Sequence, residues 1–250
     1  MEMIGSKNIK ELMNKISVCI ATYNGEKYIK EQLDSILPQL DSNDEIIISD
    51  DNSKDRTLDI IANYNDNRIK VFNNTGRGII QNFENAIINA SGEYIFLADQ
   101  DDIWNIDKVK ICLDDFDKGF DLILSNCLIF DSDSKEILYE SFFDFNRSKK
   151  GIVNNIIKNS YIGCCMAFNN RVKNKVIPFP KNIPMHDSWI GIVSEIYFKV
   201  NFNKKKLISY RKHGENASHT GTGKSAYSVR KKFSFRFYLV STIIVKYFRF

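Results

Sequence analysis

The chain has 250 residues, of which 43% are hydrophobic and 26% are charged, and its formal net charge is +4. This length allows one large α/β domain or two small ones, and the composition excludes a disordered chain. The sequence lacks the roughly 18–20 consecutive apolar residues of a membrane span, and the segment before Ile16 lacks the apolar core of a signal peptide. We therefore expect a cytoplasmic protein whose five cysteines are buried, reduced thiols.

Strands and helices are expected to alternate between residues 16 and 130. Each expected strand is a short apolar run, and each expected helix carries apolar residues on one side. This pattern predicts an α/β fold with a mostly parallel sheet and helices on both faces, in which ligands bind at the carboxyl ends of the strands. The expected strands cover 16–21, 45–49, 68–72, 93–98 and 121–130, and the expected helices cover 28–40, 57–64, 78–90 and 107–116.

The regular alternation fades after residue 130. We expect a hairpin turn at 131–134, a strand at 163–168 and a helix from Arg171 onward. Prolines at 178, 180 and 184 then mark a loop that leads to His186 and Asp187. These two polar residues are therefore expected at the end of a loop.

Asp99, Gln100, Asp101 and Asp102 directly follow the fourth expected strand. Three carboxylates on a tight loop repel one another, and a divalent cation would neutralise them. Oxygen ligands favour Mg²⁺ or Mn²⁺, which also bind substrate phosphates. The alternative is a solvated acidic turn, because an Asp-x-Asp pattern also occurs at 131–133. The position after a buried strand, near a second acidic strand end, favours the metal site.

A second acidic cluster runs from Asp50 to Asp55, where the second expected strand ends. From this position Asp51 can accept a hydrogen bond from a pyrimidine N–H or a ribose hydroxyl. The alternative is local: Ser53 would be a helix N-cap and Asp55 would lie in the first helical turn. Both interpretations can hold together, with Ser53 and Asp55 capping while Asp51 binds.

Three segments resemble the family 2 glycosyltransferases. Residues 16–25 (ISVCIATYNG) are similar to the opening strand and loop of that family, residues 49–57 (SDDNSKDRT) to its second motif, and residues 91–102 (SGEYIFLADQDD) to the strand that carries its Asp-x-Asp. The run Asp-Gln-Asp-Asp-Ile-Trp at 99–104 and the segment at 210–216 (YRKHGEN) resemble the rhamnosyltransferase-like branch that acts on bacterial surface polysaccharides. The resemblance covers about residues 16–130 and implies a GT-A fold.

The resemblance implies roles for individual residues. Tyr23 would stack on the nucleotide base, Asp51 would hydrogen-bond the base, and Asp99 would contact the ribose. Asp101 would coordinate the metal. The residues that the resemblance places around the nucleotide are Ala21, Tyr23, Asp51, Arg77 and Asp99.

An inverting transfer needs a general base for the acceptor hydroxyl. The family supplies it from a Glu-Asp pair, and the matching residues here are His186 and Asp187. The resemblance thus implies Asp187 as the base; next to it, His186 could tune this Asp or contact the acceptor, and Trp189 offers a surface on which an acceptor sugar could stack. The alternatives are an N-cap by Asp187 for a helix starting at Ser188, and a core position for Trp189.

His213 lies in a basic, glycine-containing loop, where a neutral imidazole can bind the diphosphate or complete the metal shell. The alternative is a surface histidine. The tail, residues 226–250, mixes Lys and Arg with aromatic residues. It predicts either a helix on an anionic membrane surface, at the inner face of the plasma membrane, or a helix packed on the domain.

We therefore expect a GT-A domain over residues 1–225, with a nucleotide-binding half at 16–130 and an acceptor-binding half at 131–225. The expected enzyme is an inverting, metal-dependent glycosyltransferase that uses a dTDP- or UDP-sugar and a glycan or lipid-linked acceptor. A sugar-1-phosphate nucleotidyltransferase is one alternative, but residues 22–27 supply a single glycine for its phosphate loop. A non-catalytic sugar-binding module is another. The acidic strand ends disfavour nucleic acid as a partner.

Overall fold

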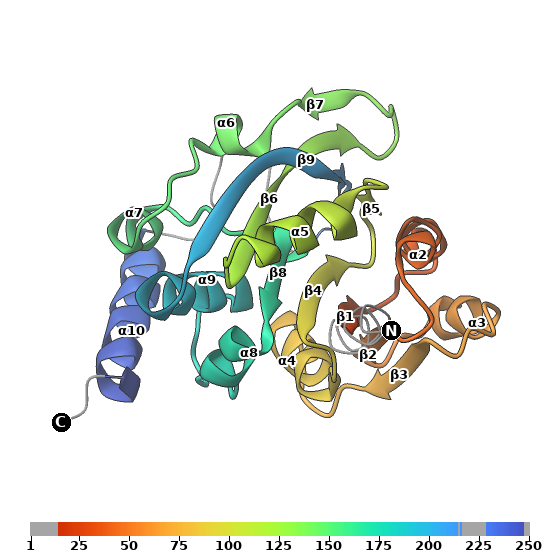
Figure 1. Cartoon of the computed structure of the whole chain (residues 1–250), viewed down its shortest axis with the longest axis horizontal. Coiled ribbons are helices and arrows are strands. Elements are labelled where there is room, and N and C mark those ends of the chain that lie inside the picture. The colour runs from red at the N-terminus through yellow and green to blue at the C-terminus, as the bar shows by residue number, and fades with distance from the viewer. Residues whose placement is uncertain (1–14, 215, 217–228, 248–250) are drawn as a thin grey trace, which may run out of the picture.

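A computed structural model describes residues 15–214, 216 and 229–247 (Figure 1). The expectation for the start of the chain concerns residues 1–14, which lie outside the described part. The strands form one sheet in the order β3-β2-β1-β4-β8-β6-β9-β5, with β7 paired to β6. The strands are β1 (Ile16–Thr22), β2 (Glu45–Asp50), β3 (Ile69–Asn73), β4 (Tyr94–Asp99), β5 (Ile103–Trp104), β6 (Leu122–Asp131), β7 (Ile137–Tyr139), β8 (Met166–Asn169) and β9 (Val200–Lys212).

The first four strands of this order, β3 to β4, pair in parallel, as the sequence predicts. Every residue of β1 and β2 is buried, which explains why both read as unbroken apolar runs. The register sets Thr22 beside Asp50 and Ala21 beside Asp99. The carboxyl ends of three strands therefore bring both acidic clusters to one edge of the sheet.

The sheet is mostly parallel, as expected, but its second half is mixed. β8 is antiparallel to both β4 and β6, while β6 and β9 are parallel. β5 and β7 are short antiparallel additions to β9 and β6. The strand expected at 163–168 begins instead with a 3-10 turn, η2 (Gly163–Cys165), and β8 starts only at Met166.

Helices cover the sheet and connect its strands (Figure 1). α4 packs against β1 and β2 and also contacts α9, which in turn contacts α7 and α8. This arrangement sets the start of α9 close to the carboxyl edge of the parallel strands. The helices are α2 (Ile29–Ile36), α3 (Thr57–Ala62), α4 (Ile79–Asn89), α5 (Lys108–Asp117), α6 (Phe142–Asn146), α7 (Ile152–Ile157), α8 (Asn170–Val176), α9 (His186–Tyr197) and α10 (Val229–Tyr247), with a 3-10 turn η1 (Leu37–Gln39) after α2.

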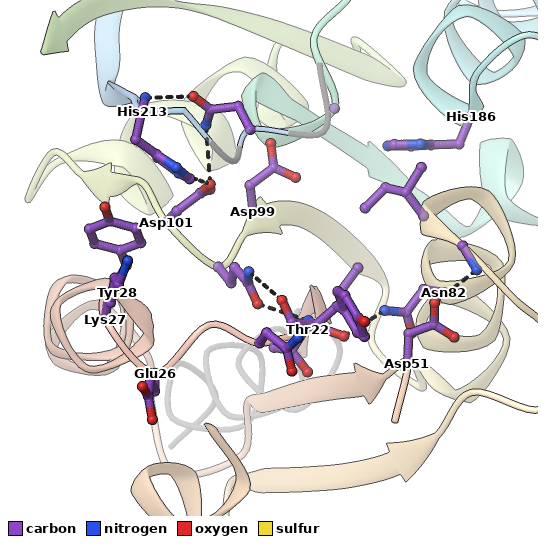
Figure 2. A pocket seen from close by; sticks show the side chains of 18 of the residues that line it. Thr22, Glu26, Lys27, Tyr28, Asp51, Asn82, Asp99, Asp101, His186 and His213 are labelled. Carbon is purple, nitrogen blue, oxygen red and sulfur yellow. Dashed lines mark hydrogen bonds and ion pairs between the residues drawn. The ribbon is translucent and has the colours of Figure 1, made fainter. Parts of the chain in front are cut away.

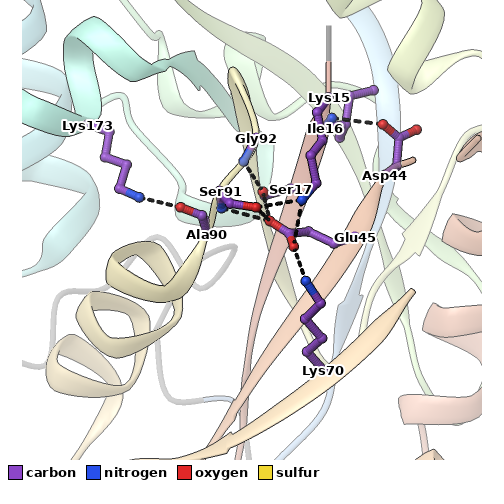
Figure 3. A network of polar contacts seen from close by, with 10 residues as sticks. All are labelled: Lys15, Ile16, Ser17, Asp44, Glu45, Lys70, Ala90, Ser91, Gly92 and Lys173. Atoms are coloured by element: carbon purple, nitrogen blue, oxygen red, sulfur yellow. Dashed lines mark hydrogen bonds and ion pairs between the residues drawn. The ribbon is translucent and has the colours of Figure 1, made fainter. Parts of the chain in front are cut away.

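The opposite, amino-terminal edge of the parallel strands is fastened by one buried carboxylate, Glu45 (Figure 3). Its oxygens accept hydrogen bonds from Lys70 Nζ at 2.7 Å, Lys15 Nζ at 3.1 Å and Ser17 Oγ at 2.6 Å. The amide and hydroxyl of Ser91 also donate to it. Burial opposes ionisation, but the bonds from Lys70, Ser17 and Ser91 outweigh it and lower the pKa of Glu45. The starts of β1, β2 and β4 are thereby tied together.

The five cysteines are buried and free, as expected. The tail contains the helix α10, which packs on the domain through buried Leu239 and through Arg236. The Arg236 Nε donates to the Ile156 carbonyl at the end of α7 at 2.9 Å. None of the helices in the described ranges has the length and hydropathy of a membrane-spanning segment.

Candidate active site

A cavity of about 850 Å³ opens at the carboxyl ends of β1, β2 and β4 (Figure 2). The turn η2 and the start of α9 form one wall, and the end of β9 with the following segment forms another. The cavity thus joins residues from both halves of the chain. The sequence-predicted residues that line it are Ala21, Tyr23, Asp51, Asp99, Asp101, His186, Asp187 and His213.

The loop after β1 is held by Gln100, a residue for which the sequence suggested no role. The Tyr23 amide donates to Gln100 Oε1 at 2.9 Å, and Gln100 Nε2 donates to the Tyr23 carbonyl at 3.0 Å. The same side chain fills the space beside Gly25, where an added Cβ would lie 2.3 Å from Gln100 Oε1. Tyr23 itself is 56% exposed, so its ring is available to stack on a flat ligand.

Asp51 lines the cavity, and its carboxylate is bound to the loop that precedes α4. Its Oδ1 accepts from Asn74 Nδ2 at 2.9 Å, and its Oδ2 accepts from the Gly78 amide at 2.8 Å. Each carboxylate oxygen has two lone pairs, so both can accept a further bond from a ligand. Arg77 is exposed and does not line the cavity, although it directly precedes Gly78, whose amide binds Asp51.

The predicted N-cap by Ser53 is wrong, and Asp55 lies before the first turn of the next helix, where its Oδ1 accepts from the Thr57 amide at 3.0 Å. α3 begins at Thr57, and its N-cap residue, Arg56, makes no side-chain cap. Ser53 Oγ accepts instead from the Asn24 amide at 2.9 Å, and Asp55 accepts from the Glu26 amide at 3.0 Å. The cluster therefore connects the loop after β1 to the loop after β2, and both Asp51 and Asp55 line the cavity.

Asp101 is held by residues that follow β9. Its Oδ2 is 2.8 Å from His213 Nε2 and accepts from Asn216 Nδ2 at 3.2 Å. The His213 amide donates to Asn216 Oδ1 at 2.7 Å, and the His213 ring lies against Tyr28 with centroids 4.8 Å apart. His213 is therefore a site residue rather than a free surface histidine. Asn216 also lines the site, although no separate role was predicted for it.

Arg211 holds the acidic loop in place through hydrogen bonds to Asp101 and Asp102. Its side chain is buried, its amide donates to Asp102 Oδ1 at 2.9 Å, and its Nε donates to the Asp101 carbonyl at 2.8 Å. The guanidinium also pairs with Glu31 and lies 4.9 Å from the centre of the Tyr28 ring. Since one arginine contacts both α2 and the acidic loop, it connects the two halves of the site.

The acidic loop has the chemistry of a divalent-cation site. Burial first, and then the charge of Asp101, raise the pKa of Asp99 to about 8. Burial and the charges of Asp101 and Asp99 also raise the pKa of Asp102. A cation would relieve this crowding.

Two groups of residues in and around this loop differ as metal ligands. Among the described residues, ligand atoms of Asp99, Asp102 and Cys164 lie within 4.8 Å of one another. Asp102 and Cys164 are fully buried, and a thiol is a poor ligand for Mg²⁺ or Mn²⁺. Asp101 and His213 line the cavity instead and offer an oxygen and an imidazole nitrogen. Their donors fit such a cation better.

His186 lies on the side of the cavity opposite Asp101 and His213 in Figure 2, and Asp187, the next residue of α9, also lines the cavity. α9 begins at His186 and its N-cap residue is Met185, so the alternative of an N-cap by Asp187 is wrong. The Asp187 carboxylate accepts from the amide and hydroxyl of Ser188. Burial outweighs these bonds and raises the pKa of Asp187 to about 6. The group is thus close to the protonation balance that a general base needs near neutral pH.

Trp189 is not a sugar-binding surface. The side chain is 0% exposed, and its Nε1 donates to the Val176 carbonyl at 3.0 Å. Trp189 lies on the buried side of α9 and does not line the cavity, so the core position is the correct interpretation.

The comparison with protein families supports the resemblance. The family described as Glycosyl transferase family 2 matches residues 17–177. A relative from Escherichia coli, UDP-Glc:alpha-D-GlcNAc-diphosphoundecaprenol beta-1,3-glucosyltransferase WfgD, is 29% identical over 168 residues, which are 66% of this chain and 64% of the relative. The dTDP-rhamnosyl transferase RfbG from Shigella flexneri is 42% identical over 103 residues, which are 38% of this chain and 36% of the relative. The chain therefore spans less than two thirds of either relative.

Solved structures show the same fold. TarS 1-349 of S. aureus, in complex with UDP-GlcNAc, gives a TM-score of 0.70 at 22% identity, over 92% of this chain and 66% of that one. A mannosyltransferase from Pyrobaculum calidifontis, in complex with GDP-Man and Mn2+, gives 0.61 at 18% identity, over 82% of this chain and 58% of that one. At these identities the likeness concerns the fold alone.

Proposed function

Since the chain belongs to glycosyltransferase family 2, we propose that it transfers a sugar from a nucleotide-diphosphate donor to a hydroxyl of a glycan or lipid-linked acceptor. One observation carries this proposal: a single cavity holds groups suited to each part of the reaction. Tyr23 and Asp51 suit a nucleoside, Asp101 and His213 suit a metal with a diphosphate, and Asp187 suits an acceptor hydroxyl.

The relatives suggest the substrates. Their names specify a UDP-Glc donor with a diphosphoundecaprenol-linked acceptor in one case, and dTDP-rhamnosyl transfer in the other. We therefore propose a UDP- or dTDP-sugar donor and a role in bacterial surface polysaccharide synthesis.

Asp187 is the proposed general base. As the acceptor oxygen forms its bond to the anomeric carbon, its proton passes to the Asp187 carboxylate. The bond from that carbon to the diphosphate oxygen breaks on the opposite face, and its electron pair leaves with the nucleotide diphosphate. The anomeric configuration is therefore inverted. Positioned bases of this kind contribute roughly 10²–10⁴-fold.

Asp101 and His213 are the proposed metal ligands, with Asp99 beside them. A divalent cation there would offset the negative charge that builds on the departing diphosphate. The mutual crowding of these carboxylates supports this assignment.

The tail is proposed to contact an anionic membrane surface, at the inner face of the plasma membrane. α10 exposes Phe237 and Ile244, and α7 beside it exposes Val153 and Ile157. The sequence of residues 226–250 adds several Lys and Arg. Replacing Phe237 and Ile244 together by Ser should weaken binding to anionic vesicles, and binding should fall with salt. Equal binding by that variant would contradict the contact.

Ligand-dependent melting tests the proposed function. A ligand that binds only the folded state at about 100 times its Kd adds about 2.7 kcal/mol of stability. UDP- or dTDP-sugars should raise the melting temperature with Mn²⁺ but not with excess chelator, and Asp101→Ala should remove the effect. Asp133→Ala is the matched control, because it lies in the second Asp-x-Asp, which is outside the cavity. Full stabilisation of Asp101→Ala, or of the wild type in chelator, would contradict the metal-dependent site.

A further inference from the structure

One wall of the cavity carries polar atoms that have no partner within the protein. Among the described residues, the buried side-chain atoms without a hydrogen bond include Asn82 Oδ1 and both ring nitrogens of His186. Both residues line the cavity, whereas Asp102 and Trp104, which hold the other two such atoms, do not. Unpartnered buried polar atoms are costly, so three of them on one cavity wall point to a ligand that supplies their bonds.

The two side chains are held in fixed positions. Asn82 Nδ2 donates to the Thr22 carbonyl at 3.0 Å, which leaves Oδ1 as the free end of the amide. The His186 ring is stacked on Phe83 with centroids 4.2 Å apart. Gly163 lies next to His186 Nε2, and because a Cβ there would be 2.5 Å from that nitrogen, the position of the ring depends on a glycine at this site. Phe83 follows Asn82 in α4, so one helix positions both residues.

The chemistry of this wall identifies the class of ligand. Burial lowers the pKa of His186 to about 3, so the ring is neutral and offers one donor and one acceptor. Asn82 Oδ1 only accepts. A phosphate has only acceptor oxygens near neutral pH and would be repelled by that oxygen, whereas hydroxyl groups donate and accept. The wall therefore suits a sugar ring.

The position of the wall indicates whether it faces the transferred sugar of the donor or the sugar of the acceptor. Asn82 is bonded to the end of β1, on the nucleotide side of the cavity, and α4 begins directly after Gly78, which donates to Asp51. Asn82 and His186 lie on the opposite side of the view from Asp101 and His213 (Figure 2). In that view Asp51 lies on the same side as Asn82 and His186, so a donor whose diphosphate reaches Asp101 must fold its sugar back across the cavity to contact this wall.

We propose that Asn82 and His186 bind hydroxyl groups of the transferred sugar and thereby help to select the donor. This inference rests on the proposed function. It goes beyond it by assigning the recognition of the donor sugar to two neutral side chains on α4 and α9.

Calorimetric titration in the presence of Mn²⁺ separates the sugar from the nucleotide. The probes are UDP-glucose with UDP, and dTDP-rhamnose with dTDP. His186→Phe keeps an aromatic ring on Phe83 but removes both nitrogens. It should weaken binding of the recognised nucleotide sugar about three- to tenfold, which is the range for one or more neutral hydrogen bonds, and leave the free diphosphate unchanged. His186→Gln, which can still donate and accept, should recover part of the loss.

Two further variants test the assignment. Asn82→Ala should also lose affinity for the nucleotide sugar more than for the free diphosphate; an equal loss for both would show that it only supports Thr22. Trp189→Phe is the matched control, since it removes a buried hydrogen bond from the same helix outside the cavity.

Without ligand, His186→Phe should melt no lower than the wild type, because it removes unpartnered buried nitrogens. A clear fall would show a structural role instead.

The outcomes distinguish this inference from the proposed function. If the wild type binds neither the nucleotide sugars nor their diphosphates, the proposed function fails, and this inference fails with it. If nucleotide sugars bind but their affinity relative to the diphosphate is unchanged in both His186→Phe and Asn82→Ala, only this inference is overturned. A loss that appears in the acceptor KM alone would also overturn it.

Discussion

Glu45 at the amino-terminal edge of the parallel strands and Asp99 and Asp187 at the carboxyl edge have pKa values shifted in opposite directions. At the amino-terminal edge Glu45 is surrounded by donors, and its bonds to Lys70, Ser17 and Ser91 lower its pKa despite burial. At the carboxyl edge, burial raises the pKa of Asp99 to about 8 and that of Asp187 to about 6.

This difference distinguishes a carboxylate that stabilises the fold, Glu45, from carboxylates that are proposed to act in the reaction. The bonds of Glu45 are made within the protein, so its charge stabilises the folded chain. At the carboxyl edge, the hydrogen bonds to Asp99 and Asp187 do not offset the effect of burial on their pKa values. We propose that a cation and the substrates supply the additional partners. Perturbed pKa values of this kind gather at functional sites. The predictions below test this contrast between the edges.

The largest effect is expected at Asp187. Asp187→Asn keeps the size of the side chain but cannot take a proton, so transfer should fall by about 10²–10⁴-fold. In the wild type, the rate should decline as the pH falls through about 6, because the base becomes protonated. Rates measured over a pH series check both points, and a near-normal rate in the variant would place the base elsewhere.

The Asp187→Asn variant should lose activity without losing stability. The pKa of Asp187 is higher in the folded chain than its ordinary value, so the folded state binds more protons between about pH 4 and 6. Ionised Asp187 therefore costs stability, and this cost appears as the pH rises through that window. Asp187→Asn should melt no lower than the wild type at pH 7, and a fall of several degrees would contradict the account.

Glu45→Gln should show the reverse behaviour. Losing the charge that Lys15 and Lys70 neutralise should cost about 3 kcal/mol of stability, while transfer per folded molecule stays unchanged. The pKa of Glu45 is lowered by folding, so its contribution is present above its ordinary pKa and is lost as the pH falls below it. Denaturant unfolding at pH 7 and pH 3 measures this. Glu140→Gln, which removes an exposed pair with Lys206, is the control and should cost under about 1 kcal/mol.

A smaller effect is expected at Asp51. Asp51→Ala should weaken binding of the nucleotide diphosphate about tenfold, the equivalent of about 1.4 kcal/mol. Because Asp51 also accepts from Asn74 and the Gly78 amide, some loss of stability will accompany this change. Titration calorimetry and melting of the empty protein compare the two effects. If the melting temperature falls and affinity does not, Asp51 serves the loop rather than the ligand.

The first half of the fold was predictable because its signals are local. β1, β2 and β4 are buried on both faces and read as apolar runs, and the acidic residues follow them directly. β9 was missed because its middle residues, 204–206, are exposed lysines that hide a strand of 13 residues.

Long-range contacts explain what was missed in the site. Arg211 and Asn216 reach Asp101 from more than 100 residues away, and no local pattern assigns them to it. Trp189 was misplaced because the sequence does not say which side of α9 faces the cavity. Gln100 stands within the acidic motif, but its bonds to Tyr23 depend on how two strand ends meet.

Sugar transfer itself gives the most direct test. Wild type and Asp187→Asn would be incubated with Mn²⁺, with UDP-glucose or dTDP-rhamnose, and with a lipid diphosphate that carries N-acetylglucosamine, and the products analysed by mass spectrometry and NMR. We predict that the wild type adds one sugar with inverted anomeric configuration and releases the nucleotide diphosphate, while Asp187→Asn is at least about a hundredfold slower. Retained configuration, or comparable rates for the two proteins, would contradict the account.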